Sequence, residues 1–136
     1  SEPVEKDEFN DDLRALVDTL HGLMIGRGAQ GRPWLPGQVA HLLYGTSAPD
    51  VPNGAARGDV VAAHYEAMLE FYGLDLGVRV ARKHLGWYLD AAAEDAGTDV
   101  PKPLRRAILT STDPRAVIGL IRAAFADALA DTQVAA

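Results

Sequence analysis

The feature that most constrains the fold is a series of helical segments, separated by short turns, in the second half of the chain. Apolar residues recur there at helical spacing, and the segments have recognisable ends. Asp59 is a good N-cap and Gly73 a good stop, while Asp113 followed by Pro114 is typical of a helix start. Four such helices joined by short turns predict an antiparallel bundle. The predicted helices cover residues 60–72, 76–96, 101–109 and 114–131.

The first half of the chain is more mixed. A helix is predicted over 11–19 from its apolar stripe. The short apolar run over 23–25 is ambiguous between a strand and a helix segment, and the glycines after it favour a strand ending in a turn. Pro33 suits the first turn of a further helix over 33–43. The loop over 45–58 is rich in Gly, Pro, Ser and Asn, and it is the best internal boundary.

Composition excludes several kinds of site. The chain has no cysteine, which removes disulfides, thiolate zinc sites and a cysteine nucleophile, and which fits a cytoplasmic protein. No apolar run approaches the roughly 18 residues that span a bilayer, and the acidic segment 1–12 lacks the apolar stretch of a secretory signal. The net charge of −6 argues against nucleic-acid binding by the overall field. However, residues 77–106 are net positive, so the charge is unevenly distributed.

The most specific string is Ile-Gly-Arg-Gly-Ala-Gln-Gly-Arg-Pro-Trp over 25–34. Glycines let backbone N–H groups approach an anion, a helix N-terminus adds partial positive charge, and arginine can bind phosphate with two hydrogen bonds. Barrels of alternating strands and helices place phosphate sites after their last strands. From spacing alone, a glycine-rich turn with solvated arginines is the commoner explanation.

Two strings together resemble one known family. The string over 24–34 resembles the flavin-phosphate segment near the end of the barrel in tRNA-dihydrouridine synthases. The string over 77–88, Gly-Val-Arg-Val-Ala-Arg-Lys-His-Leu-Gly-Trp-Tyr, resembles the signature of that family's C-terminal helical domain, in the bacterial branch once described as nitrogen-regulation-like proteins. They stand in the expected order, and the resemblance covers 22–129. It identifies the chain as a C-terminal fragment of such an enzyme.

The resemblance implies an enzyme that reduces uridine to dihydrouridine in tRNA, with FMN as hydride carrier and NADPH as reductant. Gly26 and Arg27 match the pair that holds the FMN phosphate. The family's general acid is a cysteine, which this chain lacks, so no catalytic residue is expected here. FMN binding by this piece alone is not expected either, because one strand cannot close an eight-stranded barrel.

The predicted fold is therefore mostly α: a C-terminal antiparallel helical bundle preceded by a short remnant of the last part of a flavin-binding (β/α)8 barrel. The predicted organisation is an unmatched acidic segment over 1–12, a barrel remnant with the phosphate-binding motif over 13–45, a loop over 46–58, a helical tRNA-binding domain over 59–131, and a tail over 132–136.

Three cations are the predicted RNA contacts. Arg79, Arg82 and Lys83 stand at i, i+3 and i+4, so they share one helix face. A basic face with aromatic residues nearby can hold a phosphate backbone and stack on bases, and the resemblance implies tRNA as the partner. The alternative is a solvated face, with Trp87 and Tyr88 in the core.

Other candidates favour structural explanations. A second basic cluster over 102–106 is predicted to be a solvated face, as is the carboxylate pair Glu66 and Glu70. The four histidines are scattered, and none has a familiar ligand spacing, so no metal site is expected. A competing hypothesis is a helical module that binds protein or itself, because a piece of a barrel exposes apolar surface such as 23–25.

Overall fold

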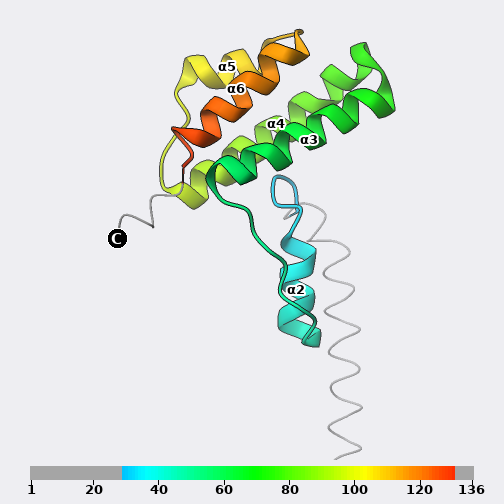
Figure 1. Cartoon of the computed structure of the whole chain (residues 1–136), viewed down its shortest axis with the longest axis vertical. Coiled ribbons are helices and arrows are strands. Elements are labelled where there is room, and N and C mark those ends of the chain that lie inside the picture. The colour runs from blue at the N-terminus through cyan, green and yellow to red at the C-terminus, as the bar shows by residue number, and fades with distance from the viewer. Residues whose placement is uncertain (1–28, 131–136) are drawn as a thin grey trace, which may run out of the picture.

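The computed structural model describes residues 29–130, and within that range it contains five α-helices and no strand (Figure 1). This confirms that the chain is mostly helical. The predicted helix over 11–19, the run over 23–25 and the tail over 132–136 lie outside the described residues. The helices are α2 (Leu35–Tyr44), α3 (Gly54–Tyr72), α4 (Leu74–Ala96), α5 (Lys102–Thr110) and α6 (Pro114–Ala126).

The core lies among the last four helices. α3 packs against α4 and α6, and α5 packs against the same two helices. Each of the four contributes to one apolar cluster, because each carries apolar residues along one stripe. The largest fully buried side chains are Tyr65 from α3, Leu85 and Leu89 from α4, Ile108 from α5, and Ile121 and Phe125 from α6.

The start of α3 differs from the prediction. The helix begins at Gly54 after Asn53, so Asp59 is not its N-cap. Asp59 instead lies inside α3, where its carboxylate is 3.6 Å from Arg122 of α6. Packing explains the longer helix: a Cβ on Gly58 would stand 2.8 Å from the Cβ of Phe125, so this turn fits closely against α6. The loop before α3 therefore ends at residue 53, five residues earlier than expected.

The other helix ends follow local signals more closely. Gly73 ends α3 with φ +83°, as predicted. The Asp113 side chain accepts a hydrogen bond from the Arg115 N–H at 3.1 Å, which confirms it as the N-cap of α6. α6 stops at Ala126 rather than near 131, because the following residues form a turn that the N–H of Leu129 closes on Ala124.

Helix α2 stands apart from the four packed helices (Figure 1). It confirms the helix predicted over 33–43, but none of its residues is buried, and Leu42 is 81% exposed. No helix within residues 29–130 is long and apolar enough to cross a membrane.

Candidate functional site

The end of the glycine-rich motif docks directly on α4. Gly31 has φ +79°, and a Cβ at this position would stand 2.3 Å from the carbonyl oxygen of Trp87. A backbone conformation and a contact of this kind both require glycine. The four residues over 31–34 thus bring the motif against the helix that carries the second family-like string.

Arg32 is tied to the end of α4. Its Nη2 donates to the Asp95 carboxylate at 2.9 Å and to the Ala91 carbonyl at 3.3 Å, and lies 3.5 Å from Glu94. The hydrogen bond with Asp95 is the main cause that raises the pKa of Arg32. The expectation of solvated arginines is therefore wrong for Arg32. Its Nη2 is also engaged within the protein rather than free to hold a phosphate.

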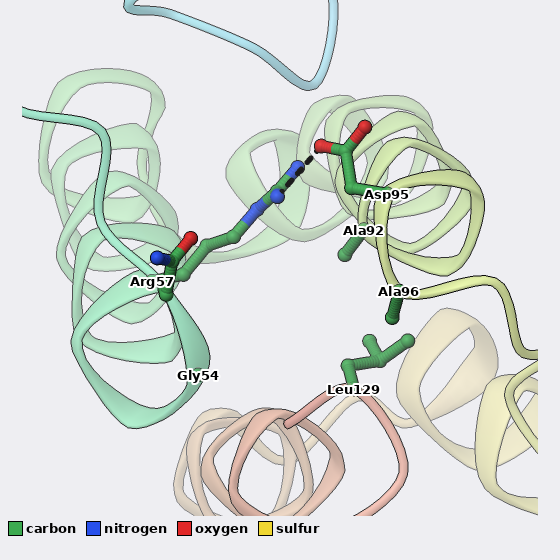
Figure 2. Close-up of a pocket in the computed structure, with 7 residues that line it drawn as sticks. Gly54, Arg57, Ala92, Asp95, Ala96 and Leu129 are labelled. Carbon is green, nitrogen blue, oxygen red and sulfur yellow. Dashed lines mark hydrogen bonds and ion pairs between the residues drawn. The ribbon is translucent and has the colours of Figure 1, made fainter. Parts of the chain in front are cut away.

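A second arginine meets the same carboxylate. Arg57 of α3, only 5% exposed, donates from Nη1 to Asp95 at 2.9 Å (Figure 2). Its guanidinium lies 4.7 Å from the centre of the Trp34 ring. Burial alone would raise the pKa of Asp95, but hydrogen bonds and charge from Arg32 and Arg57 outweigh it, so this pKa lies below its ordinary value. Arg32, Trp34, Arg57 and Asp95 are called the latch below.

The latch stands beside a small cavity. Its volume is about 30 Å³, which is room for water and far less than a flavin needs. Sequence reasoning missed this cluster, because Arg57 and Asp95 are 38 residues apart and neither has a distinctive neighbourhood. The lining residues, most of them labelled in Figure 2, are Asn53, Gly54, Arg57, Ala92, Asp95, Ala96 and Leu129.

An open groove runs along the first half of α4, on residues of the second string. Arg79 and Lys83 are exposed at its edge. Trp87 is half-buried in the groove and is not part of the core, so the alternative that placed it in the core is wrong. For Tyr88, which is 3% exposed, the predicted place in the core is confirmed. Adjacent residues of a helix point about 100° apart, so Trp87 lies beside the core when its neighbour Tyr88 lies in it. The groove is lined by Leu76, Arg79, Val80, Lys83, His84 and Trp87.

Arg82 does not line this groove. Its Nε is buried without a hydrogen-bond partner among the described residues. Burial and the charge of Asp113 raise the pKa of Tyr65, and the charge of Arg82 opposes them. The structure therefore brings Arg79 and Lys83 together in the groove and does not bring Arg82 there.

Two histidines from different helices meet beside the groove. The rings of His64 and His84 are 5.2 Å apart, and Nδ1 of His64 lies 2.9 Å from the Tyr88 hydroxyl. Burial lowers the pKa of both histidines, and the neighbouring His84 lowers that of His64 further. Linear spacing could not predict this pair, because it depends on how α3 packs on α4. No group of three metal-ligating side chains occurs in the described part of the chain.

The remaining predicted residues are dispersed. Arg105 forms an ion pair with Asp90 at 2.7 Å, whereas Lys102 and Arg106 are exposed. Glu66 and Glu70 are both exposed on α3, which agrees with a solvated face. The two predicted flavin-phosphate residues, Gly26 and Arg27, lie outside the described residues.

Fold and site together define a helical module with a basic, aromatic-lined groove, and the end of the glycine-rich motif packs on the same helix, α4. Comparison with known proteins places this module. A family model described as Dihydrouridine synthase (Dus) matches residues 8–125, and the chain belongs to that family.

Curated relatives agree with this family. A "Probable tRNA-dihydrouridine synthase" of Rhodobacter capsulatus is 51% identical over 106 residues, which are 78% of this chain and 30% of the relative. One of the same name from Rickettsia conorii is 42% identical over 96 residues, 71% of this chain and 27% of the relative. A "tRNA-dihydrouridine synthase B" of Xanthomonas campestris pv. campestris is 41% identical over 117 residues, 85% of this chain and 33% of the relative.

The chain thus spans about a third of the length of the curated relatives it matches. No solved structure matches it significantly.

Proposed function

We propose that this chain is the C-terminal, tRNA-binding part of an FMN-dependent tRNA-dihydrouridine synthase, and that it binds RNA without catalysing the reaction itself. The observation that carries the proposal is the groove on α4. It sets Arg79 and Lys83 beside the rings of His84 and Trp87, and its lining contains no carboxylate. Such a surface suits a phosphate backbone with accessible bases.

The chemistry belongs to the proposed parent enzyme, which would reduce uridine to dihydrouridine in tRNA, with FMN as hydride carrier and NADPH as reductant. Gly26 and Arg27 are the residues of this chain proposed to hold the FMN phosphate in that enzyme. We propose no catalytic residue in this chain, because it has no cysteine to act as the family's general acid. Nor do we propose that it holds FMN by itself.

The predicted RNA contacts differ in their support. Arg79 and Lys83 are exposed in the groove and are the primary candidates. Arg82 remains a candidate for a neighbouring contact, but a buried Nε leaves less of its guanidinium available. The proposal therefore depends first on the groove pair.

Titration of the chain with unmodified tRNA at several salt concentrations tests the proposal. Replacing Arg79 and Lys83 together with Ala is expected to weaken binding several-fold and to lower the slope of log affinity against log salt by roughly 1 to 2. The matched control replaces Lys102 and Arg106, two exposed cations of α5, with Ala. Absence of binding at low salt, or equal losses in both double variants, would count against the groove.

A second candidate function is self-association. Helix α2 has no buried residue and exposes Leu42 at 81% and Leu43 at 37%, so it offers apolar surface to a second copy or another protein. Sedimentation over a wide range of concentrations tests this function. A dimer that dissociates in Leu42→Glu would support it, and a monomer at every concentration would end the self-association hypothesis.

A further inference from the structure

The groove on α4 contains two aromatic side chains in a fixed relation. The rings of His84 and Trp87 are 5.1 Å apart and meet at 82°, so they form a corner instead of stacking on each other. On its other side, His84 meets the ring of His64 at 67°, and His64 is in turn placed by the hydroxyl of Tyr88. This packing holds the corner in place before any ligand arrives, which reduces the entropy cost of binding.

The charges of the groove lie beside this corner. Arg79 and Lys83 are one helical turn apart, at i and i+4, and so border the same side. Burial lowers the pKa of His84, which keeps its ring uncharged at neutral pH and makes it an aromatic wall rather than a third cation. The groove therefore combines a positively charged edge with an aromatic, uncharged interior.

These two properties favour one kind of occupant. A duplex presents phosphates but keeps its bases stacked inside, so it would leave Trp87 without a partner. An unpaired nucleotide carries both an accessible flat base and a phosphate. The apolar side chains of Leu76 and Val80 complete the lining, and they suit a base better than a second phosphate.

We propose that the groove takes one unpaired nucleotide of the RNA, with its base against Trp87 and its phosphate held by Arg79 and Lys83. The inference rests on the proposed RNA-binding function and deepens it. Trp87 then recognises local single-stranded structure, whereas the two cations supply affinity for any phosphate backbone.

The test compares three RNAs of equal length: a single strand, the same backbone without bases, and a duplex. Trp34 is 9% exposed, so a base that enters the groove quenches mainly the fluorescence of half-buried Trp87. We expect the wild-type chain to bind the single strand more tightly than the abasic backbone or the duplex, with quenching by the single strand alone.

Two substitutions of Trp87 make the test specific. Trp87→Ala should weaken binding of the single strand by roughly 5- to 150-fold, which is the loss expected when one stacked base loses its aromatic partner. The affinity for the abasic backbone should stay unchanged. Trp87→Phe should keep most of the affinity while abolishing the quenching. The control is Phe71→Ala, which removes an aromatic ring that is 81% exposed on α3 and is not part of the groove. Circular dichroism checks that each variant is folded.

The outcomes separate the two proposals. RNA binding that depends on Arg79 and Lys83 but is unchanged by Trp87→Ala would overturn the nucleotide groove and leave the RNA-binding function standing. No RNA binding by the wild-type chain would overturn both. If Trp87→Ala fails to fold, equal affinity of the wild-type chain for the single strand and the abasic backbone would still overturn the inference.

Discussion

At the scale of single residues, Asp95 joins two arginines from different parts of the chain. Its two carboxylate oxygens accept from different arginines, one before α2 and one in α3. Arg57 is buried, and a buried charge without a partner is strongly unfavourable. The ring of Trp34 covers the same guanidinium. The carboxylate therefore compensates a burial that would otherwise oppose folding.

Replacing Asp95 with Asn should lower the free energy of unfolding by about 1–3 kcal/mol at neutral pH, because Arg57 would keep its burial and lose its counter-charge. The control Glu94→Gln alters a side chain that is 79% exposed and should cost less than about 0.5 kcal/mol. Urea unfolding followed by circular dichroism measures both.

The charge of Asp95 also predicts that its contribution to stability depends on pH. The pKa of Asp95 is lowered in the folded protein, so its stabilisation is complete above the unfolded pKa of about 4 and is lost as the pH falls through the folded pKa. The stability difference between wild type and Asp95→Asn should therefore shrink below about pH 4. A constant difference between pH 7 and pH 3 would show that Asp95 stabilises the protein by something other than its charge.

Gly31 and Gly45 form a matched pair for a second residue-level prediction. Both have positive φ, so either Gly→Ala change should cost about 1 kcal/mol in backbone strain. Only at Gly31 would the new Cβ meet a neighbour, the Trp87 carbonyl at 2.3 Å, whereas nothing lies within 4 Å of Gly45. Gly31→Ala should thus lower the free energy of unfolding more than Gly45→Ala does. It should also change the near-ultraviolet circular dichroism signal of Trp34. Equal effects at both positions would contradict docking of the motif on α4.

At the scale of secondary structure, the helix ends show what can be predicted from sequence. Gly73 and Asp113 act within their own turns, and their roles were predictable. The start of α3 was not, because it depends on how Gly58 packs against Phe125 of α6, a contact between distant parts of the chain. The same limit explains why the latch and the histidine pair were missed, whereas the cations and aromatics of the α4 groove were identified from a single string.

The crossing of α3 and α4 gives a prediction at this scale. A Cβ on Gly77 would stand 2.8 Å from the Cα of Leu69, so Gly77→Ala would force the two helices apart and should cost about 1–3 kcal/mol. Gly119 lies in α6 with nothing within 4 Å, and Gly119→Ala should stabilise the protein by about 0.5–1 kcal/mol through helix propensity. Thermal unfolding of the two variants should therefore shift in opposite directions. A rise in Tm for both would show that α3 and α4 are not in close contact.

At the scale of the whole molecule, the chain carries −6 overall and yet presents a groove bordered by two cations. Composition predicted this contrast only coarsely, because it could not show that Arg105 is paired with Asp90 or that Arg82 does not line the groove. Four packed helices were predictable from periodicity, since each carries its own apolar stripe. The position of α2 was not, because it has no buried face from which packing could be inferred.

The latch has a consequence for hybrids between family members. The loop over 45–53 looks like a natural crossover point, because it separates the helices in sequence. Yet Arg32 and Trp34 lie on one side of it and Arg57 and Asp95 on the other. A chimera joined in this loop takes Arg32 and Trp34 from one parent and Arg57 and Asp95 from the other, so the latch forms only if both parents carry these four residues. The crossover point must therefore be chosen from contacts in space rather than from the linear order of the chain.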